Sequence, residues 1–473
     1  MKFKFEKRYV GKLNLLFFLT AIILFTFGCE PPPTTNTNVN VNAVPVNTNT
    51  NTSATPVAVE KNNNSETAMP VTLPVLDAMF TDENFAKDLK SNLQLTDEEI
   101  DKIKKLSRDA VTNLGETDTE NGSRSTRTAM ERANNQIREI LGDEKATKLF
   151  DVVRRHWSNG GNETDNSGNK LSSESNKVPT DTRIVVNAPA YRMDLFQDGK
   201  LIKTYKIGIG YPEFPLPSGL RQAKAIIFNP TWTPPDEPWV KDKIEAGKTI
   251  EAGSSQNPLG PIKIPIGSPS LIHGGKSAAK LGGFASHGCV GLTNSQVQDF
   301  ALNLAKVSGI ELTRQDILGY EKQKTETKNV NLEKSIPVEL RYETIVVEDG
   351  KLNIYRDVYE RGTNTEENLR RVLENNGVSF DDLKEQDRDK ILKGLKQMSF
   401  NAKGDSVAED NSNSNAGNKN SNTKSDNTDS KNKNSNTQDV EITRNIKGKK
   451  QVTFDLAELK GKGYPAPVNL SQK

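Results

Sequence analysis

The sequence of residues 272–292 is IHGGKSAAKLGGFASHGCVGL, and it holds most of the residues that could carry out chemistry. It contains His273 and His287, two of the three histidines, and Cys289, one of only two cysteines. A thiol is a poor nucleophile until it is deprotonated, which a nearby imidazole can do. Glycines follow both histidines, and they let a substrate approach backbone N–H groups closely. The pattern favours a nucleophilic cysteine, with the N–H groups of Gly288 and Cys289 donating to an oxyanion.

Three other interpretations of this cysteine remain open. A buried structural thiol is common for a free cysteine, but it does not account for the clustered histidines and glycines. A zinc site made of His273, His287 and Cys289 lacks a fourth ligand and the usual Cys-x-x-Cys spacing. A regulatory redox cysteine is the third possibility. Spacing alone therefore favours nucleophilic catalysis without excluding the others.

The segments on either side of this stretch predict a β domain. Residues 183–187 are mostly apolar, and the residues that follow alternate between apolar and polar side chains. Asp198-Gly199 predicts a hairpin turn, with residues 201–209 as the returning strand. Residues 211–269 are rich in proline and glycine, which predicts short strands and long loops. Apolar residues at helical spacing predict an amphipathic helix over residues 295–307.

The key stretch resembles the signature of the L,D-transpeptidase family, also called the YkuD domain. The resemblance lies in Ile272-His273-Gly274 and, after a glycine-rich interval, in Ser286-His287-Gly288-Cys289-Val290. Asn229-Pro-Thr-Trp232 and Asn257-Pro-Leu-Gly260 are similar to the family in order and spacing. The resemblance implies a mainly β catalytic domain, a YkuD-like β-sandwich with a short helix, over residues 181–315.

The resemblance also implies a reaction. Cys289 would be the nucleophile, and either His273 or His287 the general base. The residues expected to hold the oxyanion or position the nucleophile are Gly288, Ser286 and Gly274. The thiolate would attack the third residue of a peptidoglycan tetrapeptide stem and expel D-alanine, and an amine would resolve the thioester into a 3→3 cross-link or an attached protein. Water would make the enzyme an L,D-carboxypeptidase, and no metal or organic cofactor is needed.

One position departs from the family. An arginine usually follows the apolar residue after the cysteine, and Gly291 stands there. Lys276, Lys280 or Arg221 could supply a compensating positive charge. The departure motivates an alternative in which a catalytically degenerate domain only binds peptidoglycan. A papain-like wall hydrolase is disfavoured, because such enzymes place the cysteine before the histidine in sequence.

Residues 1–29 predict a signal peptide with a lipobox-like end. A basic start is followed by an apolar stretch that is short for a membrane span, and the segment ends at Gly28-Cys29. Lipidation of Cys29 would make the chain a lipoprotein of the bacterial cell envelope, facing the cell wall in the periplasm, and would leave Cys289 without a disulfide partner. An ordinary signal peptide with an incidental cysteine, or an uncleaved anchor, is the alternative.

The remaining segments follow from composition and periodicity. Hydrophobic residues make up only 33% of the chain, and the net charge is +2, which gives no general case for nucleic-acid binding. Thr96 and Glu99 form a capping-box signal at the start of a helix. His156, at the end of the helical region, is expected on the surface. The predicted divisions are a disordered tether (30–75), a small helical region (76–157), a linker (158–180), an α/β extension (330–400), a disordered linker (401–438) and a short β hairpin tail (439–473).

Overall fold

The structure is a computed structural model that describes residues 67–112, 125–159, 176–233, 248–399 and 448–468. The predicted signal peptide with Cys29, most of the tether, most of the 158–180 linker and the 401–438 linker lie outside the described residues. Within the described ranges, no helix is both long and apolar enough to cross a membrane.

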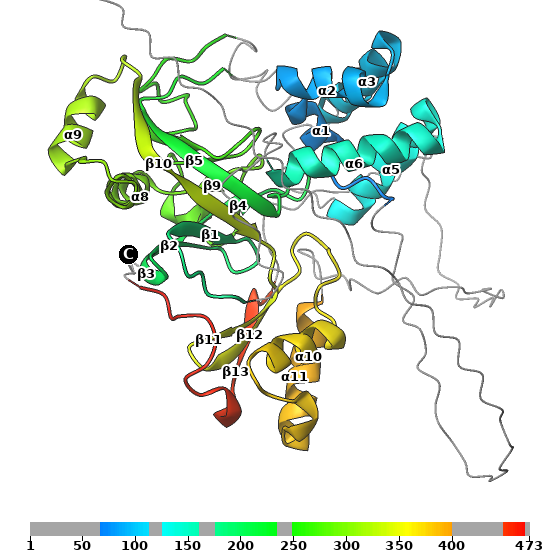
Figure 1. The fold of residues 1–473 in the computed structure, drawn as a ribbon, viewed down its shortest axis with the longest axis vertical. Coiled ribbons are helices and arrows are strands. Elements are labelled where there is room, and N and C mark those ends of the chain that lie inside the picture. The colour runs from blue at the N-terminus through cyan, green and yellow to red at the C-terminus, as the bar shows by residue number, and fades with distance from the viewer. Residues whose placement is uncertain (1–66, 113–124, 160–175, 234–247, 400–447, 469–473) are drawn as a thin grey trace, which may run out of the picture. The chain divides into compact units, whose positions relative to one another are not determined.

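The β domain is built on an eight-stranded sheet with the order β3-β2-β1-β10-β5-β6-β7-β9 (Figure 1). Most neighbours are antiparallel, but β1 pairs with β10 and β7 with β9 in parallel. The bounds are β1 (Arg183–Asn187), β2 (Arg192–Gln197), β3 (Lys200–Lys206), β5 (Gly219–Phe228), β6 (Ile262–Pro265), β7 (Leu271–His273), β9 (Val290–Gly291) and β10 (Lys328–Arg341). A separate two-stranded sheet pairs β4 (Ile209–Gly210) with β8 (Phe284–Ser286).

The predicted hairpin and helix are both present. Asp198 and Gly199 adopt positive φ values of 50° and 78° between β2 and β3, as a tight hairpin turn requires. Helix α8 (Asn294–Val307) begins at a capping box between Thr293 and Gln296. Its buried face shares one hydrophobic core with the main sheet and with β4 and β8. The mainly β domain is therefore confirmed, as a curled sheet closed by a small second sheet and a helix.

The helical region has a hydrophobic core of its own. The helices are α1 (Leu73–Met79), α2 (Glu83–Leu93), α3 (Asp97–Thr112), α5 (Thr126–Leu141) and α6 (Asp143–Asn159). The capping box is confirmed: the N–H of Thr96 donates to Glu99 at 2.9 Å, and the N–H of Glu99 donates back to the Thr96 hydroxyl at 3.1 Å. Residues 67–75, expected in the tether, are instead described with this region, where Met69 and Val71 are buried.

The prediction for His156 was wrong. Its side chain is buried, with its ring 5.0 Å from the ring of Phe85 and its Nε2 3.7 Å from a carboxylate oxygen of Asp82. Burial lowers the pKa of His156, and the charge of Asp82 opposes that shift. His156 lies at helical spacing from the apolar residues of α6, so its ring is on the buried face of that helix. The surface prediction rested only on the lack of a possible ligand nearby and overlooked this spacing.

The C-terminal extension begins later than predicted. Strand β10, which contains residues 330–341, pairs with β1 and β5 inside the catalytic sheet. The extension itself joins a three-stranded sheet to helices around a separate core. Its elements are β11 (Ile345–Glu348), β12 (Lys351–Tyr355), α10 (Glu366–Asn375), α11 (Glu385–Met398) and β13 (Gln451–Asp455). The described part of the tail supplies the strand β13, which pairs with β12, and a short 3-10 helix (Ala457–Leu459). The other arm of the predicted hairpin lies outside the described residues.

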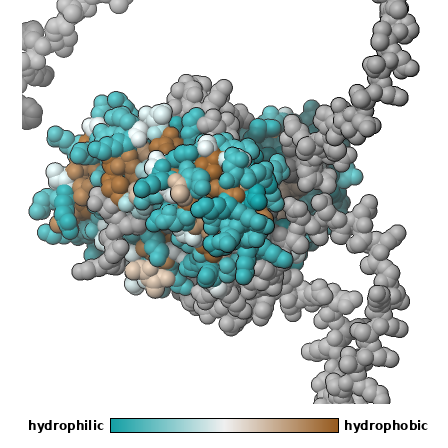
Figure 2. Space-filling view, turned by 90° about the horizontal axis from the view of Figure 1, so that it is seen from below, coloured by the Kyte–Doolittle hydropathy of each residue, from teal (hydrophilic) through white to brown (hydrophobic). Residues whose placement is uncertain are grey.

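The described surface offers little exposed hydrophobic area. The face in Figure 2 is mainly hydrophilic, and hydrophobic residues show in separate areas between polar ones. Leu318, in α9 (Arg314–Lys322), is the one large hydrophobic residue among those described whose side chain is exposed, at 40%.

Candidate active site

The two halves of the signature meet on adjacent strands. Strand β7 ends at His273, and β9 begins one residue after Cys289. The strands run in parallel with Ile272 opposite Val290 and His273 opposite Gly291. The N–H of Leu292 donates to the carbonyl of His273 at 2.8 Å. The histidine and the cysteine are thereby held near one edge of the sheet.

A short turn fixes the backbone of the cysteine. The Ser286 hydroxyl accepts from the N–H of Cys289 at 3.1 Å and donates to the carbonyl of Cys289 at 2.5 Å. Gly288, between them, has a φ of 87°, which a side chain would strain. Ser286 thus holds the backbone of the turn at Cys289. The N–H of Cys289, expected as an oxyanion donor, donates to the Ser286 hydroxyl in this structure.

The thiol is held in a setting that favours its neutral form. Cys289 is partly buried. Burial raises the pKa of the Cys289 thiol, while a backbone hydrogen bond from Leu271 and the positive charge of Lys276 both act to lower it. Deprotonation therefore depends on the groups around the sulfur.

His273 is buried and neutral. Its side chain is 3% exposed, and burial together with the charge of Lys276 lowers the pKa of His273 to about 3, against hydrogen bonds with the backbone of Gly274 and Leu259. Its Nδ1 atom is buried without a hydrogen-bond partner of good geometry. Burial and the charge of Lys276 both keep the imidazole neutral at physiological pH and lower its strength as a proton acceptor.

His287 has a different environment. Its ring meets the ring of Tyr211 edge-on at 5.1 Å and the ring of Phe214 at 4.9 Å. Both aromatics belong to the β4–β5 loop (residues 211–218). Neither was among the site residues expected from the sequence, although an aromatic pair within a proline-rich segment was a visible signal. The loop orients His287 beside the catalytic turn.

Other parts of the molecule hold the β4–β5 loop. Hydroxyl groups of Thr72 and Thr126, in the helical region, donate to the carbonyls of Glu213 at 2.5 Å and Pro212 at 2.9 Å. From the extension, the guanidinium of Arg361 donates to the carbonyl of Leu216 at 3.0 Å. The loop that contacts His287 is therefore bonded to both flanking regions.

Gly274 and the three candidate cations lie in different environments. Gly274 lies against α8, where an added Cβ would come within 2.9 Å of Val297. Arg221 is buried and donates to the carbonyl of Gly267 at 2.8 Å, so it serves the packing of the domain. Lys280 is exposed, whereas Lys276 is half-buried and its charge acts on Cys289.

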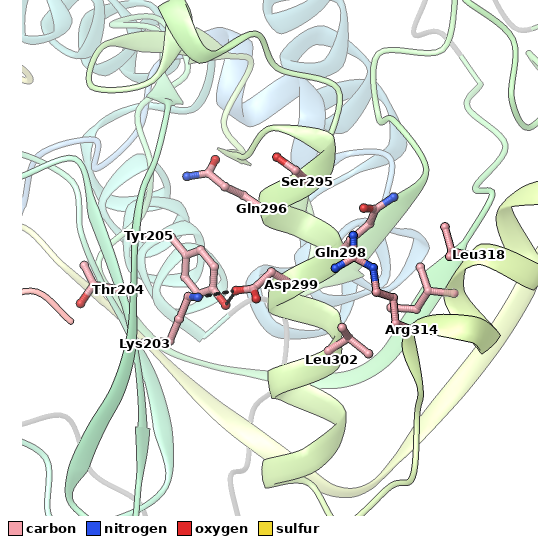
Figure 3. A pocket seen from close by; sticks show the side chains of 11 residues that line it. Lys203, Thr204, Tyr205, Ser295, Gln296, Gln298, Asp299, Leu302, Arg314 and Leu318 are labelled. Carbon is pink, nitrogen blue, oxygen red and sulfur yellow. Dashed lines mark hydrogen bonds and ion pairs between the residues drawn. The ribbon is translucent and has the colours of Figure 1, made fainter. Parts of the chain in front are cut away.

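Two surface pockets lie elsewhere. The first, about 310 Å³, lies between β3 and helices α8 and α9; in it Tyr205 and Lys203 contact one carboxylate oxygen of Asp299 at 2.8 and 3.1 Å (Figure 3). The second, about 660 Å³, is lined by the helical region, the β4–β5 loop and residues 359–361. Neither is lined by Cys289, His273 or His287. In the residues that the structure describes, no group of three His, Cys, Asp or Glu side chains is placed to hold a metal ion.

Comparison with known proteins agrees with the signature. Residues 181–319 match the family described as YkuD, L,D-transpeptidase catalytic domain. No curated protein matches the chain. Among solved structures, the catalytic domain of the E. faecium L,D-transpeptidase is 19% identical with a TM-score of 0.23, and the match covers 35% of this chain and 100% of that domain.

Two further structures cover less of their own length. An L,D-transpeptidase from Mycobacterium smegmatis is 16% identical with a TM-score of 0.21, over 34% of this chain and 58% of that one. The Ldtfm-avibactam carbamoyl enzyme is 18% identical with a TM-score of 0.22, over 34% of this chain. The chain spans about half of that enzyme, at 49%. The family match and the signature on β7 and β9 together identify residues 181–319 of this chain as a YkuD L,D-transpeptidase catalytic domain.

Proposed function

We propose that the chain is an active L,D-transpeptidase that acts on peptidoglycan tetrapeptide stems through a thioester on Cys289. One observation carries the proposal: the parallel pairing of β7 with β9 sets a neutral, buried imidazole, His273, on the strand next to the nucleophile. Such a pair suits acyl transfer, because the thiol needs a proton acceptor at the moment of attack.

The proposed reaction has two halves. His273 takes the thiol proton as the sulfur of Cys289 attacks the carbonyl of the third stem residue, a diamino acid. The tetrahedral oxyanion collapses, the amide bond breaks, and the proton on His273 passes to the departing nitrogen of D-alanine. An acceptor amine then attacks the thioester, loses a proton to His273, and releases the thiol with a new amide bond. Attack by water instead gives a tripeptide.

His273 is assigned as the base in preference to His287. His273 lies in register with the residue two positions after the nucleophile, whereas His287 is packed edge-on against two aromatic rings. Contact with apolar rings suits a positioning role better than repeated protonation. Ser286 fixes the backbone turn that presents Cys289.

The second part of the proposal concerns location. The basic and apolar start of the chain and Gly28-Cys29 support export and lipidation, so that the enzyme would sit on a membrane of the cell envelope and reach the wall through its polar tether. Cys29→Ala is expected to release the protein from the membrane fraction. A variant that remains with membranes would overturn the lipid anchor in favour of the apolar segment.

The catalytic proposal is tested by mass spectrometry of muropeptides with tetrapeptide stems, incubated with the full chain in detergent. Loss of D-alanine with a dimer that depends on Cys289 is the expected result. Loss of D-alanine with tripeptide only would point to an L,D-carboxypeptidase. Bound but unchanged muropeptide would support the second candidate, a degenerate binding domain, which Gly291 motivates.

A further inference from the structure

Gly291 and Lys276 share one small space beside the nucleophile. Gly291 is buried, and its backbone is fixed by paired hydrogen bonds of 2.9 Å with Gly208 in addition to the pairing with β7. A Cβ built on Gly291 would lie 2.8 Å from Cγ of Lys276 and 3.2 Å from its Cε. The side chain of Lys276 therefore crosses the space that any larger residue at position 291 would need.

The backbone also holds Lys276 at this place. Its N–H donates to the carbonyl of Leu292 at 3.0 Å, directly after Gly291. The neighbouring N–H, of Gly275, donates to the side chain of Asn294 at 2.7 Å, at the start of α8. Two consecutive backbone contacts thus fix where the lysine leaves the chain, and its aliphatic stem is laid across Gly291.

We propose that Lys276 is the cation of the active site, which stabilises the Cys289 thiolate and the oxyanion formed from it, and that Gly291 is a glycine because the lysine stem passes over it. The role rests on the proposed transferase reaction. Lys276 would provide the positive charge that the family places on the residue after Val290, but from the other side of the strand pair.

The charges around the site support this assignment. Burial raises the pKa of Cys289 and lowers the pKa of Lys276, and the opposite charges of the two groups counter both shifts, while Lys280 adds to the lowering at Lys276. The charge of Lys276 also adds to the lowering of the pKa of His273 by burial, which makes that imidazole a weaker base. The other cations weighed from the sequence do not fit, since Arg221 is bonded within the domain core and Lys280 is exposed.

The test measures the thiol directly and needs no substrate. Alkylation of Cys289 by iodoacetamide in the full chain is followed from acidic to alkaline pH by quantifying the peptide that contains it, which separates it from Cys29. Lys276→Met is expected to raise the pKa of the thiol, so that a rise of one pH unit slows alkylation at neutral pH about tenfold. Lys276→Arg should retain most of the rate, and Lys280→Met is the matched control, in which the thiol pKa should stay unchanged.

A double-substitution cycle tests the steric half of the proposal. Gly291→Ala should displace the lysine stem and slow alkylation although no charge is removed. In the Lys276→Met variant, the added Gly291→Ala substitution should slow alkylation little further. Equal slowing in both backgrounds would show that Gly291 acts without Lys276 and would overturn this half.

Two further results separate this inference from the transferase assignment. An alkylation profile of Lys276→Met that coincides with that of the unaltered, folded chain overturns the role of Lys276, whatever the activity. A displaced profile in a chain that releases no D-alanine keeps the cation assignment and defeats only the transferase proposal. In the active enzyme, the loss should fall on kcat rather than KM, because the charge acts on the reacting sulfur.

Discussion

The helical region and the β7–β9 strand pair each bury one histidine, and the two sites differ in what surrounds the ring. His156 packs on Phe85, with Asp82 nearby and its charge opposing the effect of burial. His273 ends the strand paired with the one that follows Cys289, and the charge of Lys276 adds to the effect of burial. Burial alone therefore does not mark a reactive histidine. The two sites differ in the cysteine one strand away from His273 and in the sign of the neighbouring charge.

The largest effects are expected when the proposed reacting groups, Cys289 and His273, are replaced. Cys289→Ala should lower turnover by roughly 10⁴-fold or more, because no other group can form the thioester. His273→Gln should lower it by about 10²–10⁴-fold, the usual range for a general base. Release of D-alanine from tetrapeptide stems measures both. Full activity of the His273→Gln enzyme would move the base role to His287.

His156→Ala is the matched control for the replacement of His273. It removes a buried ring from the helical core, so it should cost about 1–3 kcal/mol of unfolding free energy. Activity of the folded fraction should stay within a few-fold of the unaltered chain. Urea unfolding and the D-alanine assay together measure this. A large loss of activity without loss of stability would contradict the structural role assigned to His156.

The third prediction concerns the aromatic setting of His287. Phe214→Leu keeps an apolar side chain but removes the edge-on ring contact at 4.9 Å. We expect activity to fall about tenfold, since a ring contact of this kind is worth about 0.5–1.5 kcal/mol in orientation. His287→Ala should cost more. An unchanged rate for both variants would remove His287 from the site.

The fourth prediction is a dependence of stability on pH. The folded pKa of His273 is about 3, below the value near 6.5 of an unfolded histidine, so the unfolded chain binds this proton more readily in between. The contribution is fully present above about pH 6.5 and is lost as the pH falls towards 3, with a slope of up to about 1.4 kcal/mol per pH unit. His273→Gln should flatten part of that slope in urea unfolding. An identical slope would show that the pKa of His273 is the same in the folded and the unfolded chain.

The smallest effect is expected at the helical region. Thr126→Val removes the hydroxyl that donates to Pro212 in the β4–β5 loop, and should cost about 1 kcal/mol of stability. Activity should fall only a few-fold, through a looser Phe214. Thr147→Val is the matched control, because the Thr147 hydroxyl donates within α6, to the carbonyl of Asp143, and does not contact the loop. A loss of activity as large as that of His287→Ala would make the helical region part of the catalytic machinery.

The fold was predictable where local chemistry decides it. Asp198-Gly199 predicted a hairpin, Thr96 with Glu99 predicted the start of a helix, and the stretch around Cys289 predicted the family that residues 181–319 match. Strand β10 was predicted to belong to the C-terminal extension. Its partners, β1 and β5, are distant in sequence, and strand pairing depends on them rather than on the local pattern.

The candidate site was predictable in its residue types but not in its neighbours. Sequence spacing named Cys289, His273 and His287, yet left three cations equivalent. Only the pairing of β7 with β9 places Lys276 over Gly291 and leaves Arg221 in the domain core. Likewise, the ring contacts of Tyr211 and Phe214 depend on the path of the β4–β5 loop, which the turn residues in the sequence do not determine.

The measurement that tests the central claim most directly is the mass of the enzyme after brief mixing with a tetrapeptide donor and no acceptor. The proposed mechanism predicts a gain equal to the donor without its D-alanine, located on the peptide that contains Cys289, absent from Cys289→Ala and discharged by added amine. D-alanine release with no such adduct on Cys289, or an adduct that persists in Cys289→Ala, would contradict it.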